Sequence, residues 1–476
     1  MCRGRLLVAN IKDFIREIPP YYEHQNKTLA LLREQDRFFD TSDPGTAKTR
    51  PALAAFIERR TAGGKKCLVL APKSILQPAW GNEIDKFFPG TSYMVAYATN
   101  RKKAFLDHDV DIYITNHDAA KWLLNTKNIP KKYWDDFDTI IIDESTAYKH
   151  ANTQRSKAAY GLAKKMQYRE CMTGTPNPNS ITELWHQVKL LDDGKALGTS
   201  FWKFRSIVCE PRQTGPSINH LTWEDKAGSE VVVYDRIDAF SIRHKFEECV
   251  DIPPNKVTEY YIDLPPALRK HYDSMVDMAA TLLDSGQLLT AVHASAVHQK
   301  LMQIASGAVY TNLLSPDSEN PHVVLDDGRY ELVMDLAEAR EQCVVAFNWR
   351  HQRLGLEKAA TKRGRKYRII DGTVLDKHRI EAVNLFQAGE IDDIYAHPQS
   401  GGHGLTLTKG TTTIWTSPTY NAEFYKQLNH RIYRSGQTRK TETIHIIARN
   451  TYDENVYAKL GKKLTSMQLL LDLLQT

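Results

Sequence analysis

Short apolar runs rich in β-branched residues alternate with helical patterns twice along this chain, and this rhythm constrains the fold more than any other feature. Strands that alternate with helices form βαβ units and parallel sheets. The sequence therefore predicts an α/β protein with two parallel-sheet lobes in tandem. The first series of runs is CLVLAP (67–72), DIYITNH (111–117), TIIIDE (139–144) and YRECMTGT (168–175). The second is CVVAFN (343–348), YRIID (367–371), DDIYAH (392–397), TTTIWT (411–416) and ETIHIIA (442–448).

The length of the chain supports the same division. At 476 residues it exceeds what one hydrophobic core usually organises. Between the two series, residues 209–230 are turn-rich, and residues 265–306 have a helical pattern without strand signals. We expect an N-terminal lobe over residues 1–235, a connector with a helical insertion near the lobe junction over 236–330, and a C-terminal lobe over 331–476.

Composition excludes several classes of protein. Apolar residues make up 42% and charged residues 25%, as in soluble globular chains. The net charge of +6 permits polyanion binding. The six cysteines lie far apart without metal-ligand spacing, so we expect reduced, mostly buried thiols. No apolar stretch approaches the length of a membrane span. We expect a cytoplasmic protein without a membrane partner, associated with the nucleoid or the host cytoplasm if it is prokaryotic or viral.

The segment DPGTAKTR (43–50) has the features of a phosphate loop. It follows the strand-like DRFF and precedes the helical PALAAFIERR, and backbone amides at a helix N-terminus can hold phosphates. Lys48 is expected to contact the β- and γ-phosphates, and the Thr49 hydroxyl to bind Mg²⁺. Ser42 and Ala47 occupy the two glycine positions of the G-x-x-x-x-G-K-T pattern. The predicted nucleotide contacts of the loop are Gly45, Thr46, Ala47, Lys48 and Thr49.

Two carboxylates follow the strand TIIIDE at the sheet edge where ligands bind. Asp143 can hold magnesium, and Glu144 can orient and deprotonate an attacking water. At this spacing after a K-T loop, the pair indicates ATP hydrolysis.

Further segments carry a resemblance along nearly the whole chain, from about Ile18 to Asn455. They are YEHQ (22–25), LVLAPKSILQPAWGNEIDKFFP (68–89), ITNHD (114–118), MTGTPNPNSITELW (172–185), SIRHKFEECVDIPPNKVTEYYIDLPP (241–266), SGGHGLTLT (400–408) and PTYNAEFYKQLNHRIYRSGQ (418–437). In this order they resemble the motifs of helicase superfamily two, specifically its Swi/Snf branch of ATP-dependent DNA translocases, in a minimal form that contains only the motor.

The resemblance implies two RecA-like lobes that use ATP and Mg²⁺ and act on DNA. It implies that Gln25 reads the adenine edge and that Gly404 contacts the nucleotide. It also implies catalytic roles for Gln427, Arg431 and Arg434, the two arginines reaching across the cleft as arginine fingers. The chain departs from the family at Glu144-Ser145-Thr146, where an acidic-alanine-histidine sequence is usual, and at Tyr420-Asn421, where tryptophan-asparagine is common.

Motors of this type grip the phosphate backbone, so their binding is sensitive to salt. For Lys73 and Arg350 an ordinary surface charge is the alternative. Trp349 is either a stacking platform for bases or, more commonly for such a residue, part of the lobe packing. We expect the basic segment 358–368 to be a solvated loop. The DNA contacts expected from the resemblance are Lys73, Ser74, Asn116, His117, Gly174 and Thr175 in the first lobe and Asn348, Arg350, Gly401, Gly402 and Thr406 in the second.

The sequence thus predicts an ATP-dependent motor that translocates on double-stranded DNA and remodels DNA or DNA-protein structures. We expect duplex or branched DNA as its partner, a monomeric state and room for a recruiting protein. One alternative is a strand-separating or fork-remodelling DNA helicase, although no separation pin is evident. Another is a DNA-binding scaffold with a decayed ATPase, which Ser42 and Ala47 suggest. The intact Lys48, Asp143, Glu144, Arg431 and Arg434 argue against the scaffold.

Overall fold

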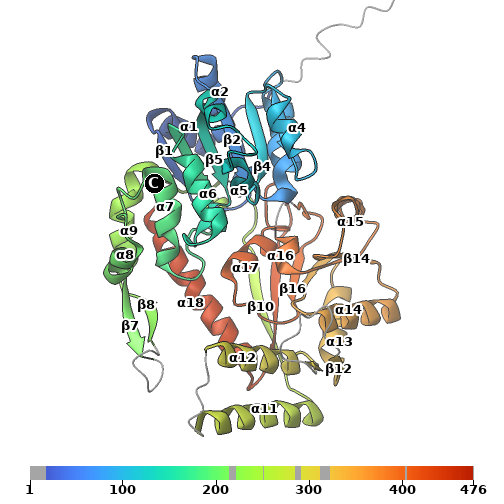
Figure 1. Ribbon diagram of the computed structural model, residues 1–476. Coiled ribbons are helices and arrows are strands. Elements are labelled where there is room, and N and C mark those ends of the chain that lie inside the picture. Colours follow the sequence, from blue (N-terminus) through green and yellow to red (C-terminus); the bar gives the residue numbers. More distant parts are fainter. Residues whose placement is uncertain are drawn as a thin grey trace, which may run out of the picture.

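Two parallel β-sheets form two lobes, as the alternating pattern predicts (Figure 1). The computed structural model describes residues 18–213, 221–249, 251–284, 291–310, 322–402 and 405–474. In Figure 1 the first lobe, blue to green, lies above the second, which is coloured orange to red. The predicted α/β fold with tandem RecA-like lobes is confirmed.

The first lobe contains a seven-stranded sheet in the order β3-β4-β2-β5-β6-β1-β9. Leu68 and Leu70 of β2 enter one core, while Cys67 and Val69 enter the core on the other face. Burial on both faces explains why this strand reads as a continuous apolar run. The strands are β1 (Arg37–Asp40), β2 (Lys66–Ala71), β3 (Tyr93–Ala96), β4 (Ile112–Asn116), β5 (Phe137–Asp143), β6 (Tyr168–Met172) and β9 (Ser241–Ile242). The helices are α1 (Glu23–Glu34), α2 (Thr49–Thr61), α3 (Asn82–Phe87), α4 (Arg101–Leu106), α5 (Ala119–Leu124), α6 (Gln154–Ala163), α7 (Leu184–Asp192), α8 (Phe201–Val208) and α9 (Ser229–Ile237).

The second lobe contains a six-stranded sheet in the order β10-β17-β16-β13-β15-β14. Val344 and Val345 of β13 enter separate cores, so this sheet too is covered on both faces. Its strands are β10 (Lys256–Ile262), β13 (Cys343–Ala346), β14 (Tyr367–Ile370), β15 (Asp393–Ala396), β16 (Thr412–Trp415) and β17 (Glu442–Ala448). The helices of this part of the chain are α13 (Gly328–Glu338), α14 (Arg350–Arg363), α15 (Asp376–Ala388), α16 (Pro398–Gly401), α17 (Ala422–Asn429) and α18 (Tyr452–Leu473).

The register of three neighbouring strands brings the first-lobe motifs together. In the sheet order β5-β6-β1, Met172 of β6 pairs with Asp143 on one side and with Asp40 on the other. All three strands are parallel, so their carboxyl ends lie at the same edge. The phosphate loop after Asp40, the acid pair Asp143-Glu144 and the turn after Met172 are therefore neighbours.

The segment 236–330, expected as a connector with a helical insertion, also adds a strand to each sheet. β9 pairs with β1 in the first lobe, and β10 pairs with β17 in the second. Neither strand has a clear sequence signal, because β9 has two residues and β10 alternates polar and apolar side chains. The remaining elements of the segment are α10 (Phe246–Cys249), α11 (Pro266–Asp284), α12 (Ala291–Ala305), β11 (Ala308–Tyr310) and β12 (His322–Val324).

The turn-rich stretch 209–230 contains a pair of antiparallel strands. β7 (Cys209–Gln213) pairs with β8 (Leu221–Asp225), and four of the five β7 residues are exposed. In Figure 1 this pair extends away from the sheet of the first lobe, below α8 and α9. The sequence does not reveal it, because its strands are short and polar.

Helix α18 joins the two lobes (Figure 1). Tyr457 and Leu460 near its start belong to a core of the second lobe. Leu470 and the following Leu474 pack in the main core of the first lobe. An ion pair between Lys245 and Asp472 (2.8 Å) adds to this attachment. The lobes are therefore connected at both the chain junction and the end of α18.

The cysteines that the structure describes are free thiols, as predicted: Cys67, Cys171, Cys209 and Cys343 are buried and Cys249 is half-buried. Across the described ranges, no helix combines the length and the apolar character that crossing a membrane requires.

Candidate active site

The phosphate loop joins β1 to α2 and is attached to the segment that follows β9. The N–H of Thr41 donates to the carbonyl of Ile242 (2.9 Å), and the N–H of Asp43 donates to the carbonyl of His244 (3.0 Å). The His244 N–H donates in turn to Oγ of Ser42 (3.0 Å). Ser42, at the first glycine position of the motif, thus accepts a hydrogen bond that glycine could not accept.

The turn of the loop is left-handed at two residues. Gly45 has φ +91° and Ala47 has φ +57°. Glycine adopts this region freely, whereas an L-residue there costs about 1–2 kcal/mol. Two side chains of α1 hold the turn: Nε2 of His24 lies 2.9 Å from the carbonyl oxygen of Thr46, and Nε2 of Gln25 donates to the carbonyl of Ala47 (3.1 Å). Gln25, expected to read adenine, therefore also contacts the phosphate loop.

The Ala47→Gly variant is expected to bind ATP as tightly as the parental chain or more tightly. Glycine adopts the left-handed conformation without a Cβ and so relieves backbone strain. Titration with a non-hydrolysable ATP analogue measures this, and Ala52→Gly, in the buried interior of α2, is the control for added flexibility. A marked loss of affinity in Ala47→Gly alone would mean that the loop depends on alanine.

Lys48 lies between the loop and the acid pair. Its Nζ donates to the carbonyls of Ser42 (2.7 Å) and Asp43 (3.1 Å). Its positive charge opposes the rise that burial causes in the pKa of both Asp143 and Glu144, so Lys48 lies close to both carboxyl groups. This is the arrangement expected of a phosphate-binding lysine.

The acid pair follows β5 directly. The Nε1–H of Trp80 donates to Oδ2 of Asp143 (3.0 Å), and the N–H of Glu144 donates to Oδ1 (3.0 Å). Burial and then the charge of Glu144 raise the pKa of Asp143 to about 6. Burial also raises the pKa of Glu144, against the opposing charges of Lys48 and Arg431. Glu144 has φ +52°, a strained conformation that is often found at functional sites.

The donor set fits a hard divalent cation. The Thr49 hydroxyl and the Asp143 carboxylate are oxygen ligands of the kind that Mg²⁺ prefers. Two neighbouring carboxyl groups with raised pKa values would be stabilised as carboxylates by a bound cation.

Two arginines of the second lobe face the phosphate loop. A Cβ placed on Gly45 would lie 3.5 Å from Cβ of Arg434. Arg431 is close enough to Glu144 for each charge to shift the pKa of the other. Both guanidinium groups donate to the carbonyl of Leu405, Arg431 at 3.2 Å and Arg434 at 2.8 Å. Burial and then Arg434 lower the pKa of Arg431 to about 9. The site is therefore composed of residues from both lobes.

Gln427 lies on α17, one turn before Arg431. Its Nε2 donates to Oε1 of Glu423 (3.3 Å), and its own Oε1 is buried without a partner among the described residues. A Cβ on Gly402 would lie 2.9 Å from that oxygen. Gly404, the other predicted nucleotide contact of this lobe, lies outside the described residues.

The predicted DNA contacts of the first lobe divide into exposed and buried groups. Lys73 is exposed and forms an ion pair with Asp376 of α15 in the second lobe (3.0 Å). Ser74 and Asn116 are half-buried, and His117 is buried with Nδ1 3.0 Å from the Tyr148 hydroxyl.

Gly174 and Thr175 are placed differently from the expectation. Both are buried, and a Cβ on Gly174 would lie 2.6 Å from Cδ of Pro44 in the phosphate loop. The reason is the register described above, which places the turn after β6 against this loop. In this conformation neither residue presents surface to a nucleic acid.

In the second lobe, three of the expected DNA contacts make contacts within the lobe. The Nδ2 of Asn348 donates to Oγ of Ser417 (2.9 Å). Gly401 and Gly402 are buried, and a Cβ on Gly401 would lie 2.9 Å from Cβ of Ala396. These glycines allow α16 to approach the sheet and α17.

Arg350 and Thr406 have more accessible positions, since Arg350 is exposed at the start of α14 and Thr406 is half-buried. Trp349 packs with Met302 and Val456. The stacking alternative for Trp349 is therefore wrong, and the packing alternative is confirmed.

The basic segment 358–368 is not the solvated loop that we expected. It covers the end of α14, a Gly364 turn and the start of β14. Arg363 pairs with Glu331, Asp335 and Glu338. Acidic residues on the neighbouring α13 therefore neutralise part of its charge.

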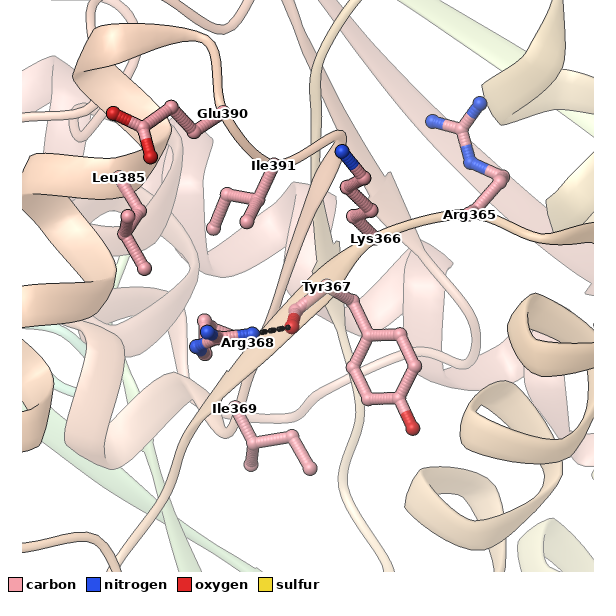
Figure 2. Close-up of a pocket in the computed structure, with 8 residues that line it drawn as sticks. All are labelled: Arg365, Lys366, Tyr367, Arg368, Ile369, Leu385, Glu390 and Ile391. Atoms are coloured by element: carbon pink, nitrogen blue, oxygen red, sulfur yellow. Dashed lines mark hydrogen bonds between the residues drawn. The ribbon is translucent and has the colours of Figure 1, made fainter.

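An open pocket of about 550 Å³ lies at the edge strand β14 (Figure 2). It is lined by Arg368 and Leu385 among others, and Arg368 donates to the carbonyl of Tyr367 (3.0 Å). None of the residues that line it belongs to the predicted site. The residues predicted for the nucleotide site lie instead at the interface between the phosphate loop and the segment of α17 and the turn after it.

The sequence did not identify several charged residues of this interface. Asp43 lies inside the phosphate loop, and Lys426 directly precedes Gln427. Their position within or beside a motif is the only sequence signal that these two residues belong to the interface. Glu423 is a third example: burial and then the charge of Glu144 raise its pKa to about 7.

The chain is similar in sequence to several known proteins. The chain is 28% identical to protein p41 of Acyrthosiphon pisum secondary endosymbiont phage 1, over 90% of this chain and 93% of that protein. It is 26% identical to Bacillus subtilis YwqA, provisionally named an ATP-dependent helicase/translocase, over 95% of this chain and 48% of YwqA. It is 26% identical to Protein CHROMATIN REMODELING 24 of Arabidopsis thaliana, over 83% of this chain and 41% of that protein. The chain thus spans less than half of the last two relatives.

A solved structure described as the Sulfolobus solfataricus SWI2/SNF2 ATPase core in complex with dsDNA is 21% identical, with a TM-score of 0.42 over 95% of this chain and 93% of that one. The family model of the helicase conserved C-terminal domain matches residues 328–436. The family model of the SNF2-related domain matches residues 24–311, more than half of the chain. The chain therefore belongs to the SNF2-related family.

Proposed function

We propose that this protein is an ATP-driven motor that translocates along double-stranded DNA and remodels DNA or DNA-protein structures. The observation that carries the proposal is the position of Arg434 against Gly45, with Arg431 close enough to Glu144 for its charge to act on that carboxyl group. A hydrolytic site that needs both lobes can convert each turnover into a movement of one lobe relative to the other.

In the proposed hydrolysis, the loop amides and Lys48 bind the phosphates. Glu144 accepts the proton of the attacking water, and the Thr173 hydroxyl, which donates to its Oε2 (3.3 Å), orients it. Arg431 and Arg434 stabilise the negative charge on the phosphoryl oxygens. Thr49 and Asp143 would hold Mg²⁺, which would neutralise phosphate charge.

DNA is proposed to bind across both lobes through phosphate contacts. Lys73 and Arg350 are exposed on different lobes, and the ion pair of Lys73 with Asp376 places the first of these at the lobe boundary. Membership of the SNF2-related family supports DNA as the partner. We propose duplex or branched DNA as the substrate, a monomeric motor and recruitment by a protein partner.

Strand separation is the second candidate function, and one observation favours it. The antiparallel pair β7-β8 projects from the first lobe (Figure 1). An exposed pair of strands of this kind could separate the strands of a duplex, although no such element is evident in the sequence.

We expect blunt duplex DNA to stimulate ATP hydrolysis and the protein to displace the third strand of a triplex without melting the duplex. Parallel ATPase assays with no nucleic acid, single-stranded DNA, blunt duplex, branched DNA and RNA test the first point. Binding should weaken steeply with salt, because each neutralised phosphate releases about one counterion.

Two results would favour the alternative. The first is stimulation of ATP hydrolysis by single-stranded DNA but not by blunt duplex DNA. The second is separation of fully paired forks into free strands. Removal of the β7-β8 hairpin distinguishes the two functions further, because it should abolish strand separation and leave triplex displacement intact.

A further inference from the structure

Asp43 is a buried carboxylate inside the phosphate loop. Its Oδ1 lies 3.0 Å from Nη2 of Arg243, and its Oδ2 accepts the N–H of Phe246 (3.1 Å). Asp43 is 5% exposed and Arg243 is 1% exposed. Burial alone would raise the pKa of Asp43, but the charges of Lys426 and Arg243 hold it below its usual range. The group is therefore a carboxylate near neutral pH.

The third partner of Asp43 comes from the other lobe. Nζ of Lys426, on α17, lies 3.5 Å from Oδ1 of Asp43, and the Lys426 side chain is 15% exposed. Directly after the end of the helix, the ring of His430 packs edge-on against Phe246, with 5.9 Å between ring centroids. Lys426 and His430 thus attach one side of α17 to the phosphate loop and its support.

Helix α17 and the turn that follows it carry residues of the proposed hydrolytic machinery. Gln427 follows Lys426 directly, and Nε of Arg431 donates to the carbonyl of Gln427 (2.8 Å). Arg431 lies in the turn that follows α17, and its N–H donates to the carbonyl of Leu428 (3.0 Å). Because these two hydrogen bonds attach Arg431 to the last turn of the helix, fixing Lys426 also fixes the approach of Arg431. Figure 1 shows α17 on the side of the second lobe that faces the first.

We propose that Lys426 is a positioning residue for ATP hydrolysis, whose ion pair with Asp43 sets the register of α17, and of the arginine-bearing turn that follows it, on the phosphate loop. This inference rests on the proposed function. It assigns Lys426 no contact with the nucleotide. The residue acts through the position of Arg431 and Arg434.

The test compares Lys426→Met, which keeps the aliphatic stem, with Lys426→Arg, which keeps the charge. In the full chain with saturating duplex DNA, Lys426→Met should lower kcat by about 10- to 100-fold, as small misplacements of catalytic groups do. The KM for ATP and the affinity for a non-hydrolysable analogue should stay within about twofold of parental values. Lys426→Arg should restore most of kcat. Lys358→Met, which breaks an exposed ion pair with Asp327 inside the second lobe, is the matched control and should be unaffected.

A double-variant cycle tests whether Lys426 acts through Asp43. If it does, Asp43→Asn combined with Lys426→Met should lower kcat no further than Asp43→Asn alone. Fully additive losses, an unchanged kcat in Lys426→Met, or a rise in KM at constant kcat would each overturn the inference. If the parental chain hydrolyses ATP and Lys426→Met hydrolyses it at the same rate, only this inference is overturned. If the parental chain has no ATPase activity, the proposed function is overturned as well.

Discussion

We expect Glu144→Gln to lower kcat for ATP by about 10²- to 10⁴-fold, the range that a general base contributes, and Lys48→Ala to abolish turnover. Glutamine keeps the shape of the side chain but cannot accept the proton of water. Lys48→Ala removes the cation that faces both the loop carbonyls and the acid pair. The rate of phosphate release at saturating duplex DNA measures both losses.

Folding controls separate these losses from damage to the structure. Glu144→Gln should leave Tm unchanged or higher, because it removes a half-buried negative charge beside Asp143. Glu34→Gln, an exposed position on α1, should have parental activity. Retained turnover in either purified Glu144→Gln or Lys48→Ala would contradict the assignment of the nucleotide site.

The sequence predicts the central strands of both sheets because those strands are buried on both faces. Strand β2, whose alternate residues enter opposite cores, leaves a continuous apolar run. Edge and junction strands leave weaker signals: β3 is half-buried, and β10 alternates polar and apolar residues. The attachment of α18 could not be predicted, since Leu470 and Leu474 meet the first lobe only in the folded chain.

The nucleotide site could be predicted further than the DNA contacts because its residues lie within continuous motifs. Lys48, Asp143 and Glu144 are brought together as expected. Gly174 was expected at the DNA, and only the strand register places it against Pro44. A sequence motif identifies candidate functional residues, but it does not show which neighbouring segment each residue contacts.

The charge of a segment does not predict its exposure where the ion-pair partners of its residues lie far away in the sequence. Segment 358–368 looks solvated by composition, yet Arg363 pairs with acids of α13, and Arg365 pairs with Asp393 of β15 (2.7 Å). For the same reason, the sequence gives no sign of the ion pair between Asp43 and Lys426. A buried ion pair across lobes depends on the tertiary arrangement, and local composition carries no trace of it.

We expect Arg431→Ala and Arg434→Ala to bind ATP almost normally and to hydrolyse it about 10³-fold more slowly, the loss typical of a missing arginine finger. Their charge acts on the transition state, so kcat should fall while the affinity for a non-hydrolysable analogue is kept. Single-turnover measurements of phosphate release, together with analogue titrations, separate the two quantities.

Arg431 and Arg434 share one hydrogen-bond acceptor, and this predicts how their losses combine. Both guanidinium groups donate to the Leu405 carbonyl, so each single variant leaves the other arginine in place. The fold-loss of kcat in the double variant should therefore be smaller than the product of the two single losses. Arg431→Lys should not restore turnover, because lysine lacks the planar fork that holds both Leu405 and the phosphoryl oxygens. Arg449→Ala, at an exposed pair with Asp263, should behave like the parental chain. If the two single variants turned over at the parental rate, the arginines would be packing residues, and hydrolysis would require the first lobe alone.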